Sequence, residues 1–147
     1  MKKRPLRILS IDDDLSCQLA AARFLTFVGG HIVEVAENGR EGIKKAATLK
    51  PDIILLDMSM PDMNGLEVME ALSSGPATRH IPVIVITGAS LSDTELDSLK
   101  VKRNFMFLEQ KPAKFNMILE KIEEIAISGI IITETRETIL SDSHEPA

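Results

Sequence analysis

The chain has 147 residues, 44% of them apolar and 27% charged, which is enough for one globular domain with a sizeable core. Its net charge of −5 and its lack of Trp and Tyr argue against a nucleic-acid-binding surface, which needs basic patches or aromatic stacking platforms. The single Cys17 excludes an intrachain disulfide, and the apolar run at residues 8–11 is too short for a signal peptide or membrane span, so we expect a cytoplasmic protein.

The first half of the chain predicts three strands separated by two helices. Residues 7–11 form an apolar run that ends at Asp12, residues 31–35 alternate like a strand, and residues 53–56 are uniformly apolar, as in a strand buried on both faces. Helices are predicted over residues 15–28 and 40–49, ended by Gly29–Gly30 and by Pro51. The positions expected to face the core are Cys17, Ala21, Phe24 and Val28 in the first helix, and Ile43, Ala46 and Ala47 in the second.

The second half continues the alternation. After a loop at residues 61–65, a helix carries Leu66, Met69 and Leu72 on one side, and residues 82–86 and 105–109 are predicted strands. Ser92 and Glu95 fit a capping box that opens a fourth helix, which has few apolar anchors and should be the least firmly docked. The last helix has the clearest apolar stripe, formed by Phe115, Ile118, Leu119, Ile122 and Ile125.

Five strands alternating with five helices predict an α/β fold. Consecutive strands joined by helices pair in parallel through right-handed crossovers, which places helices on both faces of one five-stranded sheet, a three-layer sandwich. We expect the domain to cover residues 1–127 and residues 128–147 to be a C-terminal tail or linker.

Chemically active side chains follow the ends of these strands. Asp12 and Asp13 follow the first strand, Asp57 the third, Thr87 the fourth and Lys111 the fifth. The carboxyl ends of parallel strands meet at one edge, so these side chains should converge there. Clustered carboxylates repel one another unless a cation lies among them, and hard oxygen ligands favour Mg²⁺. A carboxylate can also act as a nucleophile and form an aspartyl-phosphate, with a lysine and a hydroxyl to stabilise the phosphoryl charge.

Four segments resemble the receiver domains of two-component response regulators. They are Ile-Asp-Asp-Asp at residues 11–14, the stretch from Asp52 through Leu-Asp57-Met-Ser-Met-Pro to Gly65, Val-Ile-Val-Ile-Thr at residues 83–87, and Gln-Lys-Pro at residues 110–112. The similarity spans about residues 6–127 with the motifs in the family's order. It implies a flavodoxin-like strand order, 2-1-3-4-5.

The resemblance also implies roles for the acidic residues. Asp57 would accept a phosphoryl group from a phosphohistidine of a histidine kinase or phosphotransfer protein. Asp13 and Asp57 would bind Mg²⁺ directly with the backbone carbonyl of Ser59, and Asp12 would contribute through water. Phosphorylation would then change the affinity for a downstream protein partner, without direct contact to nucleic acid or membrane.

The remaining implied roles lie after the fourth and fifth strands. Thr87 and Lys111 would contact the phosphoryl oxygens, and Pro112 would follow a cis peptide bond. The sequence departs from the family at two places. Leu108 stands where the family usually carries a switch aromatic, whereas the neighbouring Phe107 should face the other side of the strand, and Gly88 stands where alanine is frequent.

Two other functions, a phosphatase and a flavin or nucleotide binder, would require sequence features that can be checked in this chain. A Mg²⁺-dependent phosphatase with an aspartate nucleophile usually has a second acid two residues after that nucleophile, where this chain has Ser59. A flavin or nucleotide binder would be expected to carry a glycine-rich phosphate loop, and no such motif occurs. We therefore expect a switch that turns over no external metabolite.

The tail contains three adjacent isoleucines, Ile130, Ile131 and Ile132. Burial of such side chains contributes about 1.5–3 kcal/mol each, so the segment is expected either to pack on its own domain or on the second subunit of a homodimer. The alternative is that these isoleucines begin a linker. The sequence leaves open whether the domain acts alone or within a longer chain.

Overall fold

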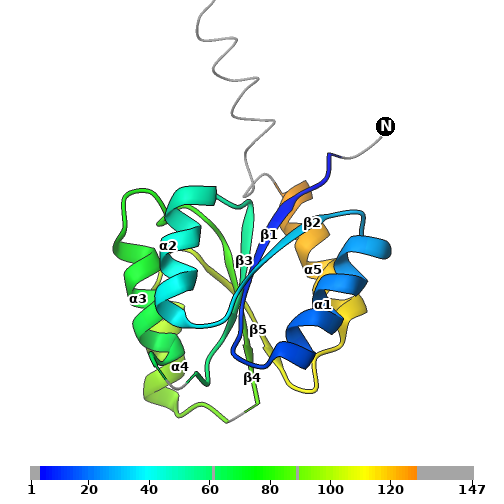
Figure 1. Ribbon diagram of the computed structural model, residues 1–147. Helices are drawn as coiled ribbons and strands as arrows, with labels where there is room; N and C mark the ends of the chain where they lie inside the picture. The colour runs from blue at the N-terminus through cyan, green and yellow to red at the C-terminus, as the bar shows by residue number, and fades with distance from the viewer. Residues whose placement is uncertain (1–3, 61, 89, 129–147) are drawn as a thin grey trace, which may run out of the picture.

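The structure is a computed structural model that describes residues 4–60, 62–88 and 90–128 (Figure 1). Within these residues, the five strands are β1 (Arg7–Ile11), β2 (Ile32–Ala36), β3 (Ile53–Asp57), β4 (Val83–Thr87) and β5 (Phe105–Gln110). The five helices are α1 (Leu15–Phe27), α2 (Gly39–Leu49), α3 (Gly65–Ser74), α4 (Asp93–Lys100) and α5 (Phe115–Ile127). All strand pairs are parallel and the order is β2-β1-β3-β4-β5, which confirms the predicted fold.

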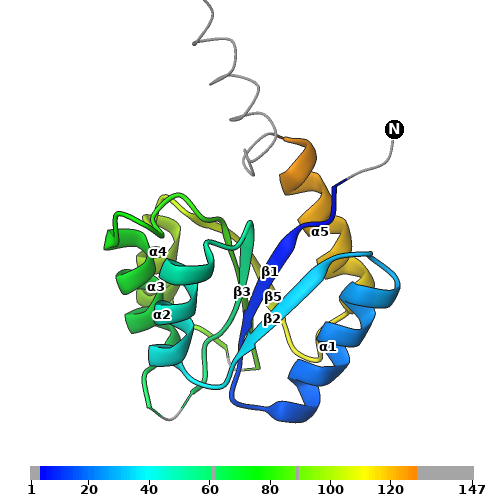
Figure 2. The same cartoon turned by 45° about the horizontal axis from the view of Figure 1, so that its top comes forward.

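Helices cover both faces of the sheet. Helices α2, α3 and α4 lie on one side and α1 and α5 on the other, as both views of the ribbon show (Figures 1 and 2). Every residue of the central strand β3 is buried, in keeping with its uninterrupted apolar sequence up to Asp57. No helix within the described ranges is long and apolar enough to span a membrane.

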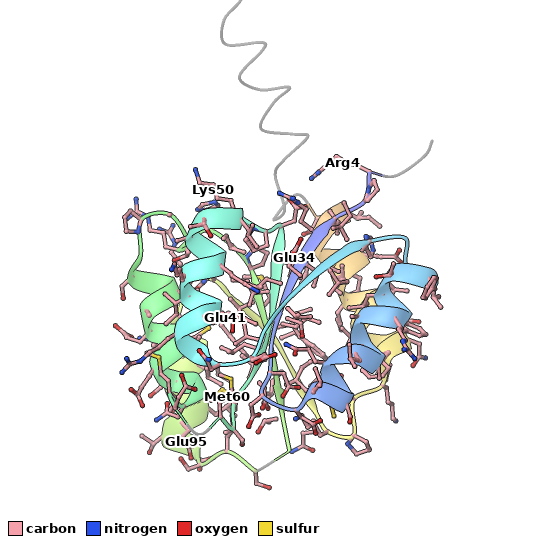
Figure 3. The ribbon with its side chains drawn as sticks, viewed as in Figure 1. Arg4, Glu34, Glu41, Lys50, Met60 and Glu95 are labelled. Atoms are coloured by element: carbon pink, nitrogen blue, oxygen red, sulfur yellow. The ribbon has the colours of Figure 1, made fainter. Side chains whose placement is uncertain are left out.

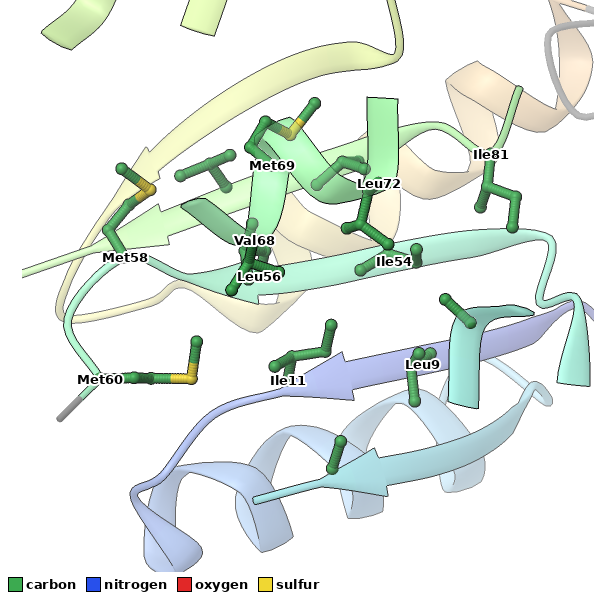
Figure 4. Packing of buried hydrophobic residues seen from close by; sticks show 14 of the residues in the cluster. Leu9, Ile11, Ile54, Leu56, Met58, Met60, Val68, Met69, Leu72 and Ile81 are labelled. Atoms are coloured by element: carbon green, nitrogen blue, oxygen red, sulfur yellow. The ribbon is translucent and has the colours of Figure 1, made fainter. Parts of the chain in front are cut away.

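Two core clusters fill the spaces between the sheet and the helices. Alternate residues of a strand point to opposite faces, so Leu9 and Ile11 join the first cluster while Ile8 joins the second. The first cluster packs under α2, α3 and α4 and includes Val85 and Leu99. Figure 4 shows other members of it, among them Leu56, Val68, Met69 and Leu72. The second packs under α1 and α5 and includes Leu25, Leu55, Ile84, Ile118, Ile122 and Ile125.

Side-chain caps fix where the first four helices begin. Asp14, Asn38, Asn64 and Ser92 each accept a hydrogen bond from a backbone N–H in the first turn of α1 to α4, respectively. The predicted capping box between Ser92 and Glu95 is confirmed. In α4 only Leu99 is buried, in line with the expectation of few apolar anchors.

The predicted inward face of α1 was partly wrong. The buried residues are Gln18, Ala21 and Leu25, whereas Cys17 is half-buried and Val28 is 63% exposed. Val28 lies at the C-cap, beyond the last helical residue, and the buried stripe is rotated from the predicted one by about one residue. A buried glutamine in this stripe was not anticipated.

Candidate functional site

The predicted site residues meet at the carboxyl edge of the sheet, the lower edge in Figure 1. Asp57 and Thr87 are the last residues of β3 and β4, and Asp12 directly follows β1. Lys111 follows β5, and its backbone N–H donates to the Thr87 carbonyl at 2.8 Å. The parallel register therefore places residues from four neighbouring strands side by side.

The three predicted carboxylates form one group. Asp12, Asp13 and Asp57 each offer an oxygen within 4.8 Å of the others. Their exposure differs: Asp57 is only 3% exposed, Asp12 is half-buried and Asp13 is exposed. Lys111 lies opposite, with its Nζ 3.3 Å from Asp57 Oδ1 and 3.9 Å from Asp12 Oδ2. One ammonium thus faces a group of three acids.

The pKa of Asp12 reflects both the burial of its carboxyl group and the neighbouring charges. Burial is the largest influence and raises the pKa to about 6, with further increases from the carboxylates of Asp57 and Asp13. The Asp14 N–H, which donates to Asp12 Oδ1 at 2.9 Å, and the charge of Lys111 oppose the rise. For Lys111, burial lowers the pKa, but Asp57 and Asp12 outweigh it, so the pKa lies above its ordinary value.

These residues fit a divalent cation. Three hard carboxylate oxygens that lie within 4.8 Å of one another repel, and the charges of Asp57 and Asp13 add to burial in raising the pKa of Asp12. A bound cation would offset that repulsion. Ser59, whose carbonyl was predicted as a ligand, lies two residues after Asp57 with an exposed side chain.

The loop after β3 is anchored by methionines that the sequence left unassigned. Met58 and Met60, on either side of Ser59, are buried in the first core cluster (Figure 4). The Met58 carbonyl accepts a hydrogen bond from the Gly65 N–H at 3.0 Å. Met58 and Met60 therefore pack in the core beside the site instead of forming an exposed contact surface.

The segment that carries Lys111 has the arrangement anticipated from its sequence. The peptide bond between Lys111 and Pro112 is cis. Leu108 packs against the first core cluster, whereas Phe107 joins the second, where the Lys121 ammonium lies 4.8 Å from the centre of its ring. A Cβ at Gly88 would lie 3.6 Å from Lys111 Cδ, so alanine would fit there.

One polar residue beside the site was missed from the sequence. Gln18 in α1 is buried under the ends of β1 and β2, and its Nε2 donates to two backbone carbonyls there. The only available signal was a polar residue one position from the apolar stripe predicted for this helix, which is an ordinary pattern for a surface position.

Known proteins share this fold and sequence. A family model for the response regulator receiver domain matches residues 8–123. The chain is 35% identical over 96 residues to a protein-glutamate methylesterase/protein-glutamine glutaminase of Archaeoglobus fulgidus, covering 65% of this chain and 27% of that protein. It is 31% identical over 132 residues to the response regulator PleD of Caulobacter vibrioides, covering 89% of this chain and 28% of PleD.

Solved structures agree with the observed fold. A CheY-like response regulator receiver domain protein of Methanospirillum hungatei superposes with a TM-score of 0.73 at 29% identity, over 82% of this chain and 93% of that one. The chemotaxis protein CheY4 of Vibrio cholerae gives a TM-score of 0.74 at 24% identity, over 83% of this chain and 99% of that one. At that identity, the second likeness concerns the fold alone.

Proposed function

The chain belongs to the response regulator receiver domain family of two-component signalling, and from this we propose that it is a phosphoacceptor switch that carries its phosphoryl group on Asp57. The observation that carries the proposal is the setting of Asp57. Its carboxylate is buried at the end of β3, grouped with Asp12 and Asp13 and 3.3 Å from the Lys111 ammonium. A nucleophile, a cation site and a countercharge thus lie together.

The proposed reaction moves a phosphoryl group from nitrogen to oxygen. A carboxylate oxygen of Asp57 attacks the phosphorus of a phosphohistidine on a histidine kinase or phosphotransfer protein. A P–O bond forms, the P–N bond breaks, and its electron pair returns to the imidazole nitrogen. Lys111, now paired with the Asp57 carboxylate, would pair with a phosphoryl oxygen in the product, and the Thr87 hydroxyl would donate a hydrogen bond to another.

Magnesium is the proposed cofactor. Asp12, Asp13, Asp57 and the Ser59 carbonyl would hold it, and it would supply positive charge to the phosphoryl oxygens. Asp12 must be ionised to take part, and its raised pKa means that protons compete with the metal below about pH 6. Metal binding should therefore weaken as the pH falls toward that value.

We further propose that the domain turns over no external substrate and acts in the cytoplasm by changing its affinity for a downstream protein. The alternative, a Mg²⁺-dependent phosphatase with Asp57 as nucleophile, needs a proton donor near the leaving group. Ser59, at the position where such enzymes carry a second acid, cannot serve as one at neutral pH. Since the chain covers 27% of its methylesterase relative, that protein's activity is not carried over.

Phosphorylation by acetyl phosphate and Mg²⁺ tests the proposal. We expect one acid-stable, base-labile phosphoryl group, detected by intact-protein mass spectrometry, and its loss in Asp57→Asn. Asp52→Asn is the matched control, because Asp52 is a second buried aspartate that accepts hydrogen bonds from the Arg7 N–H and from Arg4 at the opposite edge of the sheet. Figure 3 shows this separation: Arg4, the partner of Asp52, and Met60, which closely follows Asp57 in the chain, lie near opposite ends of the molecule. Labelling that persists in Asp57→Asn would contradict the assignment.

A further inference from the structure

Gln18 in α1 makes polar contacts that helix packing alone does not require. It is 1% exposed, and its Nε2 donates to the Ser10 carbonyl at 3.0 Å and to the Ala36 carbonyl at 2.7 Å. Its Oε1 has no hydrogen-bond partner among the described residues, so the hydrogen bonds of this side chain are those donated by Nε2. Burying an amide with an unsatisfied oxygen is unfavourable, which suggests that the two donated bonds serve a purpose.

The two carbonyls that Gln18 contacts lie where β1 ends and the acidic loop begins. In the β1–β2 register, Ser10 pairs with Val35 and Ile11 with Ala36. The Ala36 carbonyl also accepts the N–H of Asp12 at 3.1 Å. Gln18 and the backbone of Asp12 are therefore bonded to the same oxygen atom.

The other end of the acidic loop is bonded to α1. Asp14 Oδ1 accepts from the Cys17 N–H at 3.2 Å, and the Asp14 carbonyl accepts from the Gln18 N–H at 3.0 Å. The loop of residues 12–14 thus runs between a strand end and a helix turn, and the Gln18 side chain ties the two together. If this tie were lost, α1 could move away from β1, and the acidic loop would move with it.

We propose that Gln18 is a positioning residue that holds Asp12 and Asp13 close to Asp57 before the cation binds. The inference rests on the proposed function, because Mg²⁺ is taken as the ligand. The carboxylates repel one another without the cation, and repulsion favours loop positions with a wider spacing than the observed 4.8 Å. The bonds from Gln18 oppose that movement, so part of the ordering cost is met before metal binding.

Two substitutions separate positioning from general stabilisation. Gln18→Met keeps an unbranched side chain of similar length without a donor, and we expect it to weaken Mg²⁺ binding about ten-fold. In metal-free protein it should also speed hydrogen exchange of the Asp12 N–H relative to the N–H groups of β1. Asn104→Leu is the control, since Asn104 is 3% exposed, donates to the Ile81 carbonyl at 3.0 Å and lies before β5, at the other edge of the sheet. It should lower the melting temperature and leave Mg²⁺ affinity unchanged.

The unsubstituted protein gives a measurement that does not depend on any variant folding. Coupling between two sites is reciprocal, so Mg²⁺ should slow hydrogen exchange of the Gln18 side-chain amide and leave that of Asn104 unchanged. Equal Mg²⁺ affinity and equal Asp12 exchange in wild type and Gln18→Met would overturn the inference. It would also be overturned if wild type binds Mg²⁺ but the exchange rate of the Gln18 side-chain amide does not change. If wild type binds no Mg²⁺, the proposed function fails, while Asp12 exchange in the metal-free variant still decides whether Gln18 positions the loop.

Discussion

Replacing Asp12 with Asn should stabilise the metal-free protein at neutral pH. Burial, with the charges of Asp57 and Asp13, raises the pKa of Asp12 from 3.8 to about 6. At about 1.4 kcal/mol per pH unit, ionised Asp12 costs about 3 kcal/mol relative to the unfolded chain. Asparagine carries no charge and keeps the oxygen that accepts the Asp14 N–H at 2.9 Å. The attraction to Lys111, 3.9 Å away, is already included in that pKa, and solvent screens the charge of the half-buried carboxylate, so we expect a net gain of about 1–3 kcal/mol.

The gain should disappear in acid. The folded protein protonates Asp12 below about pH 6, whereas the unfolded chain does so only near pH 3.8. Between these values the folded state binds more protons, so the stability conferred at this site increases as the pH falls through 6 toward 4 and is lost as the pH rises again. Asp12→Asn has no such proton to bind. Its advantage should therefore be full at about pH 7.5 and only about one third as large at about pH 4.5.

Urea unfolding in EDTA at these two pH values measures the effect. Asp52→Asn is the control, and we expect it to lower the free energy of unfolding. Both oxygens of the Asp52 carboxylate accept a hydrogen bond, and an asparagine side chain has only one oxygen to accept with. Saturating Mg²⁺ should then stabilise wild type more than Asp12→Asn, since a ligand stabilises the state that binds it. The reasoning is refuted if Asp12→Asn is the less stable protein in EDTA at neutral pH, or if its advantage is the same at both pH values.

Three further changes address other parts of the molecule. Asp13→Asn removes a proposed direct ligand and should weaken Mg²⁺ binding by calorimetric titration, whereas equal affinity would remove Asp13 from the ligand set. Lys111→Ala should leave Mg²⁺ binding nearly intact but uncouple phosphorylation from the conformational change, and a normal change in partner binding would exclude that role. The isoleucine segment at 130–132 lies outside the described residues. If it packs on a domain, deleting residues 129–147 should lower the melting temperature or change sedimentation, and no change in either would favour a linker.

The sequence was sufficient to predict the strands and the edge of the sheet where Asp12, Asp13, Asp57 and Lys111 gather. A strand buried on both faces is apolar throughout, so a charged residue at its end, as with Asp57 after residues 53–56, marks the edge directly. Alternation within a strand also predicted that Leu108 and Phe107 face opposite sides, and their membership of different core clusters confirms it. Both inferences depend only on adjacent residues within one strand, whose polarity and alternation can be read directly from the sequence.

The buried face of α1 could not be predicted in the same way. Gln18 is buried with its Nε2 donating to the carbonyls of Ser10 and Ala36, which lie on two different strands. Hydrophobic periodicity treats each residue by its own polarity and contains no information about such partners. The same limit applies to the pKa of Asp12, which is raised mainly by the burial of its carboxyl group in the folded chain.

The acidic site links stability and metal affinity in two distinguishable ways. Removing one carboxylate, as in Asp12→Asn or Asp13→Asn, relieves repulsion and removes a group that is proposed to hold the cation, so metal-free stability should rise while Mg²⁺ affinity falls. Removing the Gln18 donors relieves no repulsion, since the amide is uncharged, and it leaves two carbonyls with fewer hydrogen bonds. Stability and affinity should then fall together. The sign of the correlation between the two measurements therefore separates a residue that binds the cation from one that positions the residues that do.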